Sequence, residues 1–222
     1  STWVLSNHDV VRHASRLALT AENQQGAGVG PKSPGKPNEE LGLRRARAAT
    51  SLMLALPGSH YLYQGEELGL PEAMELPDSA RQDPTWFRTN GEKYGRDGCR
   101  VPIPWESDKP AFGFNASGAS WLPQPADWGR FARDAQSGVA GSTLELYTLA
   151  LRLRGEHELA RGSVEWLPGF PKSVVALRNG DITVISNIGK KAVTLPSGIV
   201  VLCSGTLAGG ELAPDTTAWL AN

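Results

Sequence analysis

The tripeptide Asn7-His8-Asp9 places an amide, an imidazole and a carboxylate directly after a short apolar run. Residues 2–5 of that run are β-prone, so the pattern is typical of a strand that carries polar side chains at its C-terminal end. Parallel α/β folds collect their sites at this end of their strands. The tripeptide alone carries little weight, because Asp9 is also a suitable N-cap for a helix after the strand.

Two other groups of reactive residue types form weaker patterns. Glu66 and Glu67 are adjacent carboxylates, but neighbouring side chains diverge in direction, so we interpret them as part of a turn and not as a catalytic pair. Cys99 and Cys203 are the only cysteines, which is too few for a disulfide scaffold, and they lack the paired spacing of a zinc site. We therefore interpret them as reduced thiols and predict no metal and no cofactor.

A strand, a helix and a second strand are predicted around the polar tripeptide. Gln24 to Pro37, rich in Gly, Pro and Lys, is expected to be a surface loop. Asn38 then offers a cap before two acids, which predicts a helix through about Leu56. His60 to Tyr63 is a second short strand. This order of elements predicts a parallel βαβ unit.

The sequence pattern changes twice in the rest of the chain. Glu66 to about Gly141 has no strong periodicity, and loops of that length are often functional. Ser142 begins a capping box and an amphipathic helix through about Arg154, which gives a second βα unit. Short β-branched runs follow, and Asn179-Gly180 between two of them predicts a type I′ hairpin turn. We expect a small antiparallel β domain from about residue 160 to 222.

Three motifs in order, Trp3 to Arg12, Ala55 to Gly69 and Arg96 to Trp105, resemble the late region of the oligo-1,6-glucosidases and α-glucosidases. These enzymes form a branch of the α-amylase superfamily, glycoside hydrolase family 13. The resemblance continues through Trp121 to Pro125 and Ser142 to Leu144. It covers most of residues 1 to 155, and the β domain matches only in type.

The resemblance implies an α/β fold and a site. Residues 1–159 would be the last two βα units of a (β/α)8 TIM-type barrel, and residues 160–222 a C-terminal antiparallel β domain. Asp9 matches the third catalytic carboxylate of the family, which grips the ring hydroxyls of the sugar in the distorted transition state. His8 and Arg100 match residues that hydrogen-bond the same glucose. For Arg12 the resemblance leaves open whether the side chain reaches sugar or braces the loop.

These residue types suit the implied chemistry. An oxocarbenium-like transition state needs hydrogen bonds to sugar hydroxyls that strengthen as the ring flattens, and a carboxylate is a strong acceptor for them. The planar donor fork of Arg100 would hold the far edge of the glucose. A structural histidine and a loop ion pair are the alternatives for His8 and Arg100. Tryptophans 86, 105, 121 and 128 offer faces for stacking on sugars, although we expect at least half of the seven tryptophans in the core.

A retaining glycosidase also needs a nucleophile and a general acid. The family supplies them in motifs of the type Gly-x-Arg-x-Asp and Gly-Glu, and neither occurs here in the right setting. We therefore predict the C-terminal segment of a retaining α-glucosidase that hydrolyses terminal α-linked glucose from oligosaccharides, inactive as this chain alone. The alternatives are a non-catalytic assembly module that binds the N-terminal part of the barrel and a carbohydrate-binding module. Only Trp166 and Trp219 would serve the latter in the β domain.

The composition of the chain excludes some classes of binding partner. The 222 residues have 40% hydrophobic content and a net charge of −1, and the charges are mixed along the chain, which argues against nucleic acid or an anionic membrane. The longest apolar stretch is far shorter than a membrane span, so we predict a cytoplasmic protein. The sequence opens with Ser1 and at once a strand, so we expect it to start inside a domain. The expected partners are an α-glucoside and either the N-terminal part of the same enzyme or a second copy.

Overall fold

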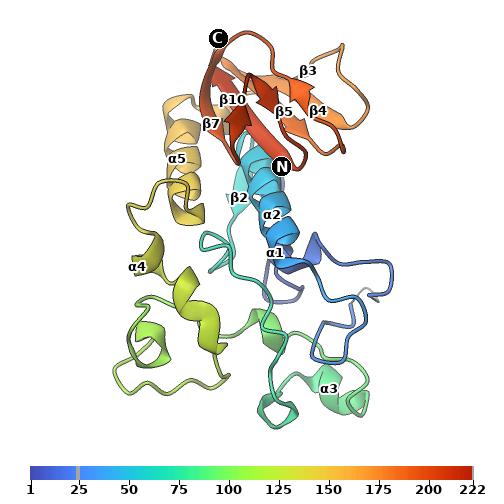
Figure 1. The fold of residues 1–222 in the computed structure, drawn as a ribbon, viewed down its shortest axis with the longest axis vertical. Helices are drawn as coiled ribbons and strands as arrows, with labels where there is room; N and C mark the ends of the chain where they lie inside the picture. The colour runs from blue at the N-terminus through green and yellow to red at the C-terminus, as the bar shows by residue number, and fades with distance from the viewer. Residues whose placement is uncertain (24–25, 222) are drawn as a thin grey trace. The chain divides into compact units, whose positions relative to one another are not determined.

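The computed structural model describes residues 1–23 and 26–221, and it has an α/β fold (Figure 1). Gln24, at the start of the predicted loop, and Asn222, at the end of the predicted β domain, lie outside the described residues. The described chain divides into two compact units. The first consists of Ser1–Val4, Arg44–Tyr61 and the residues from Glu145 onward, and the second of Leu5–Leu43 and Leu62–Leu144.

The predicted parallel pair of strands is confirmed. Strand β1 (Thr2–Val4) pairs in parallel with β2 (Ser59–Tyr61), with Trp3 opposite His60. Helix α2 (Glu39–Leu54) connects them and begins as predicted, because the side chain of Asn38 accepts the main-chain N–H of Leu41 at 2.8 Å. The helix ends two residues earlier than predicted, and β2 begins and ends earlier than the predicted second strand.

The strands from residue 164 onward pair antiparallel, as predicted. Five of them form one sheet in the order β3-β4-β5-β10-β7 (Figure 1). Three short ones form a second sheet in the order β6-β9-β8. Their bounds are β3 (Val164–Trp166), β4 (Val174–Asn179), β5 (Ile182–Asn187), β6 (Val193–Thr194), β7 (Ile199–Cys203), β8 (Leu207–Ala208), β9 (Glu211–Leu212) and β10 (Thr216–Ala221). Strand β10, between β5 and β7, was not expected from the sequence.

The turn between β4 and β5 lies one residue later than predicted. Asn179 pairs with Ile182, so the two turn residues are Gly180 and Asp181. Gly180 has a φ of +61°, which a glycine adopts readily. The side chain of Asn179 is buried and donates to the main-chain oxygens of Ala55 and Leu159 at 2.7 and 2.9 Å. Asn179 is therefore the last residue of β4, and its side-chain amide is hydrogen-bonded in the interior.

Side chains of the large sheet bind the main chain of α2. Trp219 is fully buried and its indole N–H donates to the carbonyl of Ser51 at 2.9 Å, while the hydroxyl of Thr217 donates to the carbonyl of Ala48. Helix α5 (Thr143–Glu156) closes the C-terminal end of α2, because Arg154 donates to the carbonyls of Leu54 and of the two loop residues 56 and 58. The carbonyl of Leu54, one of the orphan carbonyls at this helix end, is thereby satisfied.

The long aperiodic segment of the second unit has its own core. Leu68, Leu70, Val101, Leu122 and Trp128 are among its buried members. The segment contains only short helical pieces in the described part of the chain. They are α3 (Pro84–Arg88), α4 (Arg133–Gln136) and the 3-10 turns η1 (Asp78–Ala80), η2 (Asp97–Cys99), η3 (Pro110–Gly113) and η4 (Ala126–Phe131). Helix α1 (His13–Arg16) precedes them, and η5 (Leu159–Arg161) belongs to the first unit.

The expectation that at least half of the tryptophans are core residues is wrong. Of the seven, all within the described residues, only Trp128 and Trp219 are fully buried. Trp86 is half-buried and stacks on Tyr94. The exposed tryptophans are Trp3, Trp105, Trp121 and Trp166. They lie in loops and in the short strands β1 and β3, where too few neighbours surround a large ring to bury it.

Helices that span membranes are long and apolar, and none of that kind occurs within residues 1–23 and 26–221.

Candidate functional site

Asp9 stands in a tight turn after β1. Its main-chain N–H donates to the side-chain oxygen of Asn7 at 2.8 Å, which is the local bond by which asparagine stabilises turns. Ser6, one residue earlier, is buried and its hydroxyl accepts the N–H of His13 at 3.0 Å at the start of α1. The segment from residue 6 to 13 is thus pinned at both ends, and Asp9 lies on its exposed side.

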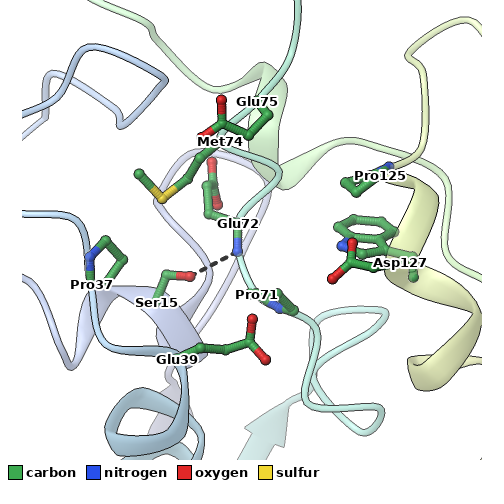
Figure 2. A pocket seen from close by; sticks show the side chains of 10 residues that line it. Ser15, Pro37, Glu39, Pro71, Glu72, Met74, Glu75, Pro125 and Asp127 are labelled. Atoms are coloured by element: carbon green, nitrogen blue, oxygen red, sulfur yellow. Dashed lines mark hydrogen bonds between the residues drawn. The ribbon is translucent and has the colours of Figure 1, made fainter.

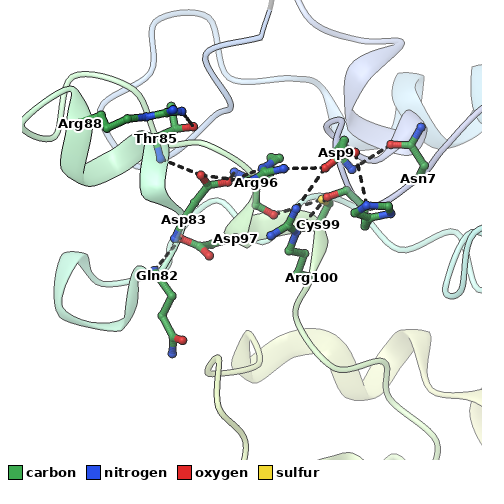
Figure 3. A network of polar contacts seen from close by, with 11 residues as sticks. Asn7, Asp9, Gln82, Asp83, Thr85, Arg88, Arg96, Asp97, Cys99 and Arg100 are labelled. Atoms are coloured by element: carbon green, nitrogen blue, oxygen red, sulfur yellow. Dashed lines mark hydrogen bonds and ion pairs between the residues drawn. The ribbon is translucent and has the colours of Figure 1, made fainter.

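The two oxygens of the Asp9 carboxylate have different surroundings (Figure 3). Oδ1 accepts from Arg96 Nη1 at 2.7 Å and from Arg100 Nη2 at 3.1 Å. Oδ2 lies 3.3 Å from His8 Nε2. The side chain of Asp9 is 49% exposed, and the hydrogen bond from Arg96 is the main cause that lowers its pKa. Asp9 is therefore an ionised carboxylate at neutral pH, held by one oxygen.

Arg100 holds two parts of the turn at once. Its Nε donates to the main-chain oxygen of His8 at 2.9 Å, while its Nη2 reaches Asp9. The structure thus brings together His8, Asp9 and Arg100, three of the four residues selected from the sequence. Their roles toward a substrate stay predictions.

Arg12 lies apart from these three and is only 2% exposed. Its Nη1 and Nη2 donate to the carbonyls of Gln64 and Cys99 at 2.8 and 2.9 Å, and its guanidinium carbon lies 5.0 Å from the centre of the Tyr63 ring. Both terminal nitrogens thereby bind main chain from two other loops. This geometry favours the alternative in which Arg12 braces the loop.

Two buried titratable groups lie beside Arg12. Glu72 accepts the main-chain N–H of Arg12 at 2.8 Å, and its burial raises its pKa to about 7. His13 lies with its Nδ1 3.9 Å from Glu66 Oε2, and its burial lowers its pKa to about 3, so this histidine is neutral in the fold. Glu67, the neighbour of Glu66, accepts the N–H of Gly65 at 2.8 Å.

A separate pocket in the same unit is lined by acidic side chains (Figure 2). Glu39, Glu72, Glu75 and Asp127 contribute carboxylates to its wall, and the N–H of Glu72 donates to the hydroxyl of Ser15 at 2.9 Å. Within the described residues no group of three or more His, Cys, Asp and Glu side chains is arranged to hold a metal ion. The side chains of His8, Asp9, Asp83, Arg96 and Arg100 are linked to one another and form the Asp9 network. None of the residues that line the pocket belongs to it.

Arg96 and Asp83 are the members of the network that sequence reasoning missed. Asp83 is buried, accepts the N–H of Thr85 as the cap of α3, and accepts Arg96 Nε at 2.6 Å. Burial raises the pKa of Asp83, but the donors from Arg96 and Thr85 outweigh it and hold that pKa well below its usual range. Asp83-Pro84 is a recognisable helix start, and Arg96 opens the motif that contains Arg100. Nothing local indicates that they meet.

The sequence of this chain is similar to those of known glucosidases and maltases. A probable alpha-glucosidase of Rhizobium meliloti (strain 1021) is 36% identical over 166 residues, which is 74% of this chain and 26% of that protein. Maltase A1 of Drosophila melanogaster is 27% identical over 168 residues, 74% of this chain and 24% of that protein. The chain spans about a quarter of the length of these curated relatives.

A solved structure extends the comparison to nearly the whole chain. The crystal structure of XgtA, an alpha-glucosyl transfer enzyme, superimposes with a TM-score of 0.72 at 31% sequence identity, and covers 99% of this chain and 40% of that one. The profile of the family described as "Alpha amylase, catalytic domain" matches residues 1–162, which is more than half of the chain. With that match over the segment that carries His8, Asp9 and Arg100, this chain belongs to the alpha-amylase family and contains part of its catalytic domain.

Proposed function

We propose that this chain is the C-terminal segment of a retaining α-glucosidase that removes terminal α-linked glucose from oligosaccharides. In this proposal residues 1–159 are the last two βα units of a (β/α)8 barrel and residues 160–222 a C-terminal antiparallel β domain. The nucleophile and the general acid come from parts of the enzyme outside this chain. Relatives named as alpha-glucosidase and maltase support this choice of activity.

The contacts of the Asp9 carboxylate carry the proposal. Two guanidinium groups hold Oδ1, so the carboxylate stays ionised and keeps one direction. The hydrogen bonds of those donors are to Oδ1 and not to Oδ2, and His8 Nε2 lies 3.3 Å from Oδ2. An ionised oxygen next to an imidazole is suited to accept hydrogen bonds from the hydroxyls of a glucose ring. These hydrogen bonds strengthen as the ring flattens toward the oxocarbenium-like state.

We assign the remaining site residues as follows. His8 and Arg100 contact the same glucose as Asp9, His8 through its exposed imidazole and Arg100 through donors that Asp9 and the His8 carbonyl do not use. Arg12 holds the loops behind them. The proposal includes no metal and no cofactor, because protonation and attack at the anomeric carbon need only two carboxyl groups.

Activity of the complete reading frame tests the function. We expect it to release nitrophenol from nitrophenyl α-glucoside, and we expect the 222-residue chain alone to release none. Asp9→Asn in the complete protein is expected to lower kcat/KM by about 10²-fold or more, because the weakened bonds are those of the transition state. Asp181→Asn is the matched control, since Asp181 is also exposed and paired with a histidine, at 2.8 Å. An Asp9→Asn enzyme as active as this control would refute the assignment.

An exposed pair of strands suggests the partner of this segment. Val4 on β1 is 45% exposed and Tyr61 on β2 is 66% exposed. Within residues 1–23 and 26–221 these two strands pair with no third strand. A two-stranded sheet with apolar side chains in water is marginal and offers an edge for pairing. We propose that the N-terminal part of the same barrel covers these strands, with pairing of two copies as the alternative. Light scattering and amide NMR on the isolated chain test this proposal. A soluble monomer by light scattering, with sharp NMR amide signals for residues 1–65, would contradict it.

A further inference from the structure

Asp9 depends on other residues for its orientation. Its side chain is half-exposed and branches from a turn, so bonds from the loop around residues 96–100 hold it in one rotamer. Arg96 makes the shortest of these bonds, at 2.7 Å. Arg96 has a long, flexible side chain, so it can hold Asp9 in place only if other residues fix its guanidinium.

Asp83 provides that fixed point. Its side chain is 0% exposed and accepts the main-chain N–H groups of Thr85 and Arg96, at 2.8 and 2.9 Å, in addition to Arg96 Nε. The main chain around it is held in turn by Asp97, whose Oδ2 accepts the N–H groups of residues 82 and 83. An anchor with this many bonds to main chain cannot reorient without breaking the turn.

Gly95 makes the close approach possible. It has a φ of +71°, and a Cβ at this position would lie 2.8 Å from Cγ of Asp83, closer than real Cβ contacts allow. Only a glycine lets the residue before Arg96 lie directly against the Asp83 carboxylate. The side chain of Arg96 lies between the carboxylates of Asp83 and Asp9, as Figure 3 shows.

We propose that Arg96 is a positioning residue, which transfers the fixed orientation of the buried Asp83 to Asp9 and leaves Oδ2 of Asp9 directed toward the substrate. This inference rests on the proposed function of Asp9. Arg96 uses Nε on one carboxylate and Nη1 on the other, so a single planar group sets the geometry between them.

The same contact lowers the pKa of Asp9. The charged or titratable groups that face its carboxylate are Arg96, Arg100 and His8, and the hydrogen bond from Arg96 is the largest of the effects on its pKa. Loss of Arg96 removes that bond and leaves Arg100 and His8 in place. The pKa of Asp9 therefore rises when Arg96 is neutralised.

Two substitutions separate geometry from charge. Arg96→Gln removes both, while Arg96→Lys keeps the charge but cannot span Asp83 and Asp9 with one planar group. We expect Arg96→Gln to raise the pKa of Asp9, measured by carbon-13 NMR of the labelled carboxyl group in the complete protein, and Arg96→Lys to return it toward the original value. In the complete enzyme we expect both variants to lower kcat by about 10²-fold, with a smaller change in KM, because a misplaced group costs that much.

Arg130→Gln is the matched control. Arg130 also bridges two carboxylates of the same unit, Glu39 at 2.6 Å and Asp127 at 3.0 Å, and has no contact with the Asp9 network among the described residues. It is expected to leave kcat and the Asp9 titration unchanged. If Arg96→Gln leaves both unchanged as well, the inference is overturned. If the complete wild-type protein hydrolyses no α-glucoside, the proposed function fails, and the Asp9 titration still decides whether Arg96 controls this carboxylate.

Discussion

Replacing the buried Glu72 by glutamine is expected to stabilise the protein at pH 8 and to leave its stability nearly unchanged at pH 4. Glu72 lies in the wall of the acidic pocket (Figure 2) and is 5% exposed. Its Oε2 accepts the main-chain N–H of Arg12. Glutamine keeps an oxygen for that bond and removes the charge. The change therefore isolates the cost of a buried carboxylate.

The magnitude follows from the pKa of Glu72. Burial raises it from the ordinary 4.5 to about 7, against the opposing effects of the Arg12 N–H and the guanidinium groups of Arg12, Arg16 and Arg81. Between pH 4.5 and 7 the folded state binds more protons than the unfolded state at this group, so the free energy of unfolding falls as the pH rises. At 1.36 kcal/mol per pH unit the loss reaches about 3 kcal/mol above pH 7.

Urea denaturation at pH 4 and pH 8 measures the effect. We expect the glutamine variant to gain up to about 3 kcal/mol over wild type at pH 8 and about zero at pH 4. Glu75→Gln is the control, since Glu75 has a 65% exposed side chain paired with Lys36 at 2.6 Å, and exposed pairs contribute about 0–1 kcal/mol. A difference between wild type and Glu72→Gln that is the same at both pH values would refute the reasoning.

Three further substitutions or reactions test the fold. Arg12→Met is expected to lower the free energy of unfolding by about 3 kcal/mol, because the carbonyls of Gln64 and Cys99 lose charged donors. A loss below about 1 kcal/mol in urea would mean that water replaces these donors. Trp219→Ala is expected to cost about 3–5 kcal/mol, measured in the same way, because it leaves a cavity and an unsatisfied Ser51 carbonyl. Cys99 is expected to resist thiol reagents at pH 8 in the folded chain, since burial raises its pKa to about 12; labelling of Cys99 at the rate of a free thiol, found by peptide mass analysis, would contradict this.

Local sequence patterns predicted the main elements well. The cap at Asn38 with the acids after it identified the start of α2, and short β-branched runs identified the region of antiparallel strands. These predictions succeed because caps and alternation depend on residues a few positions apart. The hairpin turn was one residue off because the side-chain amide of Asn179 donates to the carbonyl of Ala55, in the turn after α2 and 124 positions away.

The sequence by itself also determined which residue types stand after β1, and motifs along the chain made His8, Asp9 and Arg100 candidates. Only the tertiary structure decided how they are supported. Arg96 meets Asp9 across 87 positions and Asp83 across 13, and Arg12 is turned inward onto carbonyls of two distant loops. Any arginine is compatible with solvent, carboxylate or carbonyl as a partner. Which of these it meets depends on the folded path of loops that carry no periodic signal, because the deciding contacts form only after the chain has closed on itself.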